Sequence, residues 1–177
     1  MTKLYLIRHC QAEGQEPEAQ LTADGHEQAE KLALFLEKYN INRIISSPFT
    51  RTIQTITPFA HNHNLEIEVD ERLKERVLSS ENLSDWFEKL KQTFEDEDIK
   101  FTGGESTKEA TERIVSFVTE LSQIQSDHVA IITHGNLSAL LLNHMSQDFG
   151  FDQWLKLSNP DVYVIENDTY KRIWDSK

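Results

Sequence analysis

Residues 4–14 read LYLIRHCQAEG, where four apolar residues, Leu4 to Ile7, end abruptly in Arg8 and His9. The apolar run is typical of one buried strand, and it is too short for a membrane span or a secretory signal. A strand that simply reaches the surface would explain the two polar residues. In the alternative interpretation, the carboxyl end of a strand presents a reactive pair to a crevice. The rest of the sequence favours this second interpretation.

Composition limits the classes of function. With 177 residues, the chain is long enough for one domain with its own core. The 18 basic and 30 acidic residues give a net charge of −12, which disfavours nucleic-acid and membrane-surface partners. A small anionic substrate remains compatible if its pocket is locally positive. The single cysteine excludes an internal disulfide, and we see no targeting signal, so we expect a soluble, cytoplasmic protein of unknown oligomeric state.

Strand and helix patterns alternate along the chain. Strands are predicted at 3–7, 43–46, 66–70 and 128–133, a C-terminal hairpin at 162–174, and helices at about 21–39, 48–61, 82–94, 106–124 and 135–146. Ser47 and Pro48 are expected to begin the second helix, and Pro58 to kink or end it. Ser106 and Glu109 form a capping-box pattern. The alternation predicts a three-layer α/β/α fold with a mostly parallel central sheet. We expect one domain, 1–177, with residues 76–103 as a small cap.

Three predicted strands end in polar residues. They lead into Arg8-His9, into Ser46-Ser47-Pro48 and into Thr133-His134-Gly135. In an open α/β sheet the carboxyl ends of parallel strands gather at one edge, where ligands bind. If these strands are neighbours, Arg8, His9 and His134 meet there.

Arg51 is expected to join the same edge, about one turn into the helix that follows Pro48. The free N–H groups of a helix N-terminus favour an anion. Two guanidinium groups, Arg8 and Arg51, match the oxygens of phosphate geometrically. The sequence therefore predicts a pocket for a tetrahedral anion.

The motifs at this edge resemble those of the histidine phosphatase superfamily, also called phosphoglycerate mutase-like or RHG proteins. The matching stretches occur in the family's order, as IRHCQA at 7–12, LTADGHEQA at 21–29, SSPFTRTIQT at 46–55, LKE at 73–75, GGES at 103–106 and THGN at 133–136. They cover most of the chain, and the SSPxxRxxQT stretch is the most specific. One residue departs from the family's pattern, because Cys10 stands where the family has glycine.

The resemblance implies a role for each matching residue. His9 would attack phosphorus to form a phosphohistidine, with one ring nitrogen held by an acceptor that the sequence does not identify. Arg8, Arg51 and His134 would hold the phosphoryl oxygens, so no metal or other cofactor is expected. Glu75 would be the general acid and base, together with His9 and His134 as catalytic residues. Glu71 is a weaker rival, since only Glu75 matches the L-x-E pattern.

Several residues have simpler explanations than a chemical role. A lone histidine at a strand end is usually structural, and Arg51 or Glu75 could be an ordinary surface residue. His61 and His63 suggest a metal pair but fit a polar loop better. The Cys10 thiol could have a depressed pKa near Arg8 and be reactive, or the substitution could be harmless.

The reaction predicted from this resemblance is hydrolysis. The loop between His9 and Leu21 is short, and so is the segment from Glu75 to Gly103, so the cap should be small and the pocket open to water. We therefore expect a metal-independent phosphomonoesterase for a small phosphorylated metabolite. A phosphoglycerate mutase and a non-catalytic module that binds phosphorylated ligands are the alternatives.

Overall fold

One six-stranded sheet forms the centre of the molecule. The computed structural model describes residues 2–124 and 127–175. The strands lie in the order β3-β2-β4-β1-β5-β6, with bounds β1 Lys3–Arg8, β2 Arg43–Ser46, β3 Ile67–Val69, β4 His128–Thr133, β5 Asp161–Glu166 and β6 Thr169–Arg172. The first four in this order run parallel, and β5 and β6 add an antiparallel hairpin beside β1. The predicted, mostly parallel sheet is confirmed.

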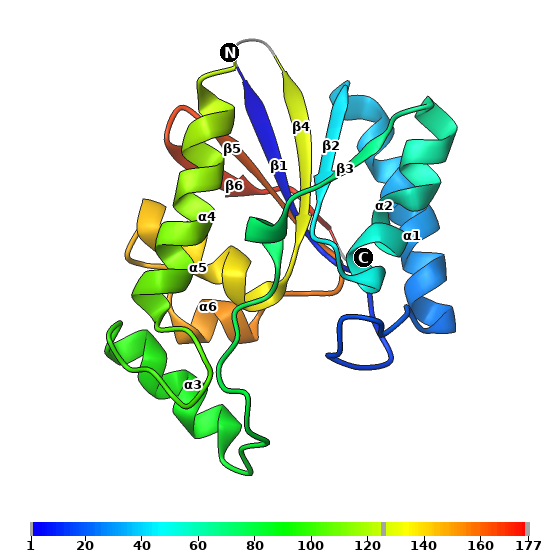
Figure 1. Cartoon of the computed structure of the whole chain (residues 1–177). Helices are drawn as coiled ribbons and strands as arrows, with labels where there is room; N and C mark the ends of the chain where they lie inside the picture. The colour runs from blue at the N-terminus through cyan, green and yellow to red at the C-terminus, as the bar shows by residue number, and fades with distance from the viewer. Residues whose placement is uncertain (1, 125–126, 176–177) are drawn as a thin grey trace.

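Helices cover both faces of the sheet. They are α1 Ala23–Leu36, α2 Thr50–His63, α3 Trp86–Glu95, α4 Thr107–Ser122, α5 Gly135–Met145 and α6 Phe151–Leu155, with short 3-10 turns at Glu37–Tyr39 and Glu71–Leu73. Figure 1 shows α1 and α2 on one face of the sheet and α4 and α5 on the other. This arrangement is the three-layer α/β/α architecture that the alternating pattern predicts.

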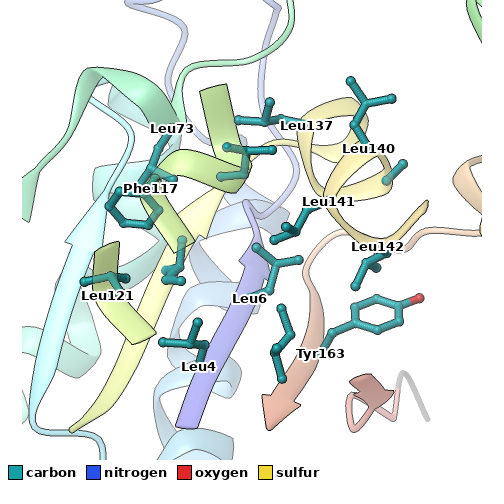
Figure 2. Packing of buried hydrophobic residues seen from close by; sticks show 14 of the residues in the cluster. Leu4, Leu6, Leu73, Phe117, Leu121, Leu137, Leu140, Leu141, Leu142 and Tyr163 are labelled. Carbon is teal, nitrogen blue, oxygen red and sulfur yellow. The ribbon is translucent and has the colours of Figure 1, made fainter. Parts of the chain in front are cut away.

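The side chains of β1 alternate between two cores. Leu4 and Leu6 pack with α4 and α5, in the cluster that includes Phe117 and Leu141 (Figure 2). Their neighbours Tyr5 and Ile7 point to the other face, into a cluster built from α1 and α2. Because successive side chains of a strand point to opposite faces, a strand covered on both faces reads as a continuous apolar run. This explains why aliphatic and aromatic residues follow one another without interruption from Leu4 to Ile7.

Strand register brings the predicted polar ends together. Arg8 pairs with Thr133 across β1 and β4, and Ser46 pairs with Ile132 across β2 and β4. The residues that follow these strands therefore emerge at the same edge. Beyond that edge, on the side of α6, lie α3 and its flanking segments (Figure 1). Phe87 and Phe94 of α3 pack against Phe151 of α6.

Some local predictions hold and others do not. The Ser106–Glu109 capping box begins α4, and the hairpin turns at Asn167 and Asp168. Pro58, however, lies inside α2 without ending it, because the helix continues to His63. His61 and His63 consequently belong to its last turns, where a polar loop was expected. The third helix starts at Trp86, four residues later than the apolar pattern indicates.

Ser47 does not cap α2. Helix α2 begins at Thr50, and the residue before it, Phe49, has no side-chain cap. The Ser47 hydroxyl instead lies 2.8 Å from His134 Nε2. The same hydroxyl also accepts from the Phe49 N–H over 3.3 Å, so its local contact lies before the first turn of α2. In the described part of the chain, no helix is long and apolar enough to cross a membrane.

Candidate active site

His9 follows β1 directly and is held in one orientation. Its Nδ1 lies 2.7 Å from the carbonyl oxygen of Cys10. A carbonyl only accepts, so Nδ1 carries the hydrogen and Nε2 keeps its lone pair. Arg51 Nε donates to that lone pair over 3.2 Å. Burial, aided by the positive charges of Arg51 and Arg8, lowers the His9 pKa to about 3, so the ring is neutral near pH 7.

Arg51 lies in the first turn of α2 and is fully buried. Its Nη1 donates to the carbonyl oxygens of Gln15 at 3.1 Å and Glu16 at 2.9 Å. Its guanidinium also lies 5.0 Å from the ring centre of Phe49. These contacts fix the group that donates to His9. Sequence reasoning missed Gln15 and Glu16, because a backbone carbonyl leaves no mark in the residue type.

Arg8 reaches the same site from the last residue of β1. Its Nη1 donates to the carbonyl of Leu157 over 3.1 Å, and its Nε is buried with no partner in the described chain. Gly135 lies directly against it, since a Cβ at 135 would be 2.8 Å from Arg8 Nε. The absence of a side chain at Gly135 therefore makes room for the guanidinium group.

His134 follows β4 and is completely buried. Its ring centre is 5.3 Å from that of His9, and its Nε2 contacts the Ser47 hydroxyl. Burial holds its pKa well below the ordinary value. Its Nδ1 has no hydrogen-bond partner among the described residues.

Glu75 faces the site from the segment after the Glu71–Leu73 turn. Its carboxylate accepts backbone N–H hydrogen bonds from Arg76, Asn136 and Leu137, at 2.8, 3.0 and 2.9 Å. The last two donors belong to the first turn of α5, whose helix dipole favours a negative charge. Glu71 is exposed and paired with Lys74, away from these groups.

Arg113 of α4 fixes the segment that carries Glu75. Its Nη1 donates to the carbonyls of Arg72 and Lys74, at 2.7 and 2.9 Å. Its other donors pair with the Glu105 carboxylate, at 3.0 Å each. The position of Glu75 therefore depends on α4 as well as on α5.

A pocket of about 500 Å³ opens beside these groups. Its wall contains Arg8, Glu75 and Arg76, and its remaining lining is Gln15, Leu78, Trp86, Leu90, Gly135, Asn136 and Trp154. This volume suits a small organic molecule. A smaller hollow of about 200 Å³ lies at the other end of β1, against Thr2 and Leu4, and none of the predicted site residues lines it. The pocket beside Arg8 and Glu75 is therefore the candidate binding site, and it shares Glu75 and Arg76 with a hollow of about 700 Å³ that Arg51 also lines.

Cys10 is not the reactive thiol considered from the sequence. The side chain is fully buried against Leu21 and Ala29, and burial raises its pKa to about 12. Its backbone φ is not positive, so position 10 has no special need for glycine. The side chain is a packing residue, and its carbonyl is what contacts His9.

The structure therefore brings Arg8, His9, Arg51, Glu75 and His134 to one edge of the sheet. Sequence reasoning did not find two further residues there. The Asn159 side chain donates to the His9 carbonyl over 2.9 Å, and Asn136 lines the pocket. Asn136 belongs to the THGN motif, so the sequence could have identified it as a site residue. Asn159 lies in no such motif. Among the described residues, no three His, Cys, Asp or Glu side chains lie close enough together to hold a metal ion. His61 and His63 are therefore not part of such a group.

Several known proteins resemble this chain in sequence or in fold. The family model described as the histidine phosphatase superfamily (branch 1) matches residues 4–176. Phosphoserine phosphatase 1 of Hydrogenobacter thermophilus is 28% identical over 76% of this chain and 71% of its own length. A probable phosphoglycerate mutase of Escherichia fergusonii is 28% identical over 94% of this chain and 85% of its own. A mycobacterial glucosyl-3-phosphoglycerate phosphatase solved with inorganic phosphate shares the fold, with a TM-score of 0.77, 23% identity, and coverage of 98% and 97%.

Proposed function

Because this chain belongs to the histidine phosphatase superfamily, we propose that it is a phosphomonoesterase for a small phosphorylated metabolite. The reaction proceeds through a phosphohistidine at His9. The phosphoserine phosphatase relative supports this substrate class, since its name describes a small phosphorylated metabolite. The size of the pocket beside Glu75 agrees with it.

One observation carries the proposal. The hydrogen bond from His9 Nδ1 to the Cys10 carbonyl leaves Nε2 unprotonated, and its lone pair accepts a hydrogen bond from Arg51 and lies near His134. A neutral imidazole with a fixed tautomer is the form that can attack phosphorus. A histidine that served only as packing would not need its second nitrogen aimed at a guanidinium donor.

In the first step, Nε2 of His9 forms a bond to phosphorus while the ester P–O bond breaks. Glu75, in its protonated form, gives its proton to the leaving oxygen. Arg8, Arg51 and His134 hold the phosphoryl oxygens and stabilise the charge that develops on them.

In the second step, a water molecule attacks the phosphohistidine. Its proton passes to the Glu75 carboxylate, the P–N bond breaks, and inorganic phosphate leaves. His9 is thereby returned to its neutral form. No metal or other cofactor takes part, because Arg8 and Arg51 already supply the positive charge that a divalent cation would bring, and they would repel such a cation.

Residues 76–103 form a small cap within a single domain in this proposal. Leu78, Trp86 and Leu90 of this segment line the pocket, and Trp86 is half exposed, which is consistent with a cap that covers the pocket only partly. We also propose a cytoplasmic location, which the single, unpaired Cys10 supports.

The test is hydrolysis of p-nitrophenyl phosphate in the presence of EDTA. We expect turnover by the native chain and a loss of at least about 1,000-fold in His9→Ala, because the nucleophile is gone. His61→Ala, at an exposed position on α2, is the control and should keep the native rate. Equal rates in native and His9→Ala protein would refute a phosphohistidine pathway.

A phosphoglycerate mutase is the second candidate. It is favoured by the probable mutase relative, which aligns with 94% of this chain. Interconversion of 2- and 3-phosphoglycerate, followed alongside phosphate release, separates the two reactions. Faster interconversion than phosphate release would favour the mutase. Binding of inorganic phosphate without either reaction would indicate a non-catalytic module.

A further inference from the structure

The connecting segment, residues 157–160, lies between α6 and β5 and holds two residues of the site. Within the described chain, Arg8 Nη1 donates to the carbonyls of the first two residues of this segment, at 3.1 and 3.5 Å. The side-chain amide of Asn159 donates to the His9 carbonyl over 2.9 Å. The segment belongs to neither a helix nor a strand. Its shape therefore depends on contacts other than those of a regular backbone ladder.

Asp161, the first residue of β5, fixes the end of the connecting segment. Its side chain is 1% exposed, and its carboxylate accepts from the backbone N–H groups of Ser158 and Val162, at 3.1 and 3.0 Å. Asp161 also pairs with Arg8 across β5 and β1. A buried carboxylate is costly unless a cation neutralises it. The geometry at this place therefore depends on the cation that pairs with Asp161.

Arg172, the last residue of β6, is that cation. Its Nε donates to the Asp161 carboxylate over 2.8 Å, and its Nη2 donates to the Ser158 hydroxyl over 3.1 Å. The same hydroxyl donates to the Pro160 carbonyl over 2.7 Å. One guanidinium group therefore holds the connecting segment both directly and through Asp161.

The contacts of Ser158 link Arg172 to Arg8. Its N–H donates to Asp161, its hydroxyl accepts from Arg172, and its carbonyl accepts from Arg8. An ion pair that served only the hairpin would join β5 to β6 and leave this segment alone. The carbonyls of the segment orient the Arg8 guanidinium group, and a small displacement of a group that binds the reacting centre can cost much of its effect.

We propose that the Asp161–Arg172 ion pair positions Arg8 for the phosphoryl group by holding residues 157–160. Neither residue lines the pocket, so both are positioning residues and not catalytic ones. This inference rests on the proposed function, in which Arg8 binds the phosphoryl oxygens. Phosphate binding does not require turnover, so the two can fail separately.

The test is calorimetric titration with inorganic phosphate, at constant ionic strength and at a temperature where circular dichroism shows each variant folded. We expect Arg172→Met and Asp161→Asn each to weaken phosphate binding by about fivefold. Arg43→Met is the matched control, because it removes an arginine from the exposed Arg43–Glu68 pair, away from the site. It should keep the native affinity.

The two variants change the net charge in opposite directions, which separates positioning from long-range electrostatics. Loss of the Arg172 charge alone would weaken the binding of an anion, whereas loss of the Asp161 charge alone would tighten it. Weaker binding in both variants therefore requires a change in geometry. Asp161→Asn also covers the case that Arg172→Met does not fold, because the Arg172 side chain is 41% exposed and can be solvated without its partner.

A double-mutant cycle tests whether the pair acts through Arg8. In an Arg8→Met background, where Arg51 remains to bind phosphate, Arg172→Met and Asp161→Asn should each change the affinity by less than about twofold. The inference is overturned if Asp161→Asn tightens binding, if both variants keep the native affinity, or if their fivefold effects persist without Arg8.

Hydrolysis of p-nitrophenyl phosphate by the native chain tests the proposed function on its own. Coupling between Arg172 and Arg8 without hydrolysis would leave the positioning role standing and refute the phosphatase. Hydrolysis without coupling would do the reverse.

Discussion

At the scale of single residues, His9 shows how one backbone contact sets the reactivity of a side chain. The Cys10 carbonyl fixes the hydrogen on Nδ1 of the ring, and Arg51 donates a hydrogen bond to the other nitrogen, Nε2. The sequence pointed to Arg8, His9 and His134 because they follow predicted strands, whose carboxyl ends gather at one edge of the sheet. It pointed to Arg51 because that residue lies near a helix N-terminus, which favours an anion. The Cys10, Gln15 and Glu16 carbonyls could not be predicted, since every residue has a carbonyl and only the folded chain aims it.

The neutral state of His9 should make stability depend on pH. Its pKa is about 3 in the folded chain against 6.5 ordinarily, so the unfolded chain binds more protons as pH falls below about 6.5. The free energy of unfolding should therefore decrease with acidity, by up to about 1.4 kcal/mol per pH unit for this residue. The pKa of His134 is lowered in the same direction and adds to the effect.

Urea unfolding between pH 6.5 and 5 measures this dependence. In His9→Gln the slope against pH should be smaller than in the native chain, because one titrating group is gone. His61→Gln, an exposed control, should keep the native slope. An unchanged slope in His9→Gln would mean that burial does not hold His9 neutral.

At the scale of elements, strand ends were easier to predict than helix starts. Buried strands can be recognised in a sequence as continuous apolar runs, such as Leu4 to Ile7 and Val129 to Ile132. The start of a helix depends on whether the side chain of the candidate cap residue bonds to the helix backbone or to another partner. Ser47 has the right type for a cap, but His134, far away in sequence, lies against its hydroxyl. Ser106 has no such competitor, and there the local pattern holds.

The capping box of α4 should contribute measurably to stability. The Ser106 hydroxyl accepts from the Glu109 N–H over 3.1 Å, and the Glu109 carboxylate accepts from the Ser106 N–H over 2.9 Å. Ser106→Ala should lower the free energy of unfolding by about 1 kcal/mol. Ser116→Ala, on the exposed side of the same helix, should change it by less than about 0.5 kcal/mol. Equal losses in the two variants would argue against the capping contribution.

At the scale of the whole molecule, the alternating pattern predicted the layers but not the strand order. Layers follow from local periodicity and from covering both faces of a sheet. The order β3-β2-β4-β1-β5-β6 depends on pairings between residues more than 100 positions apart, such as Lys3 with His128. The candidate site also forms only when distant parts of the chain come together, because its residues come from β1, α2, the Glu75 segment and α5.

A site assembled from the whole chain should couple phosphate binding to folding. Inorganic phosphate at about 100 times its dissociation constant should raise the free energy of unfolding by about 2.7 kcal/mol, since only the folded chain binds it. For a chain of this size that corresponds to roughly 5–10 °C in melting temperature. Thermal unfolding with phosphate, against sodium chloride of equal ionic strength, measures the gain. Arg51→Met should lose it, and an equal gain from chloride would point to a general salt effect.

The buried cations at the sheet edge have a further consequence for how a substrate arrives. Arg8 and Arg51 lie within a chain of net charge −12. Far from the protein, a phosphate ester is repelled by the net negative charge of the chain. Only near the pocket is it attracted by the two guanidinium groups. Salt screens the distant repulsion first, because the Debye length is about 10 Å at 0.1 M. Moderate ionic strength therefore speeds the encounter, which is the reverse of the behaviour of an enzyme whose whole surface shares the charge of its site.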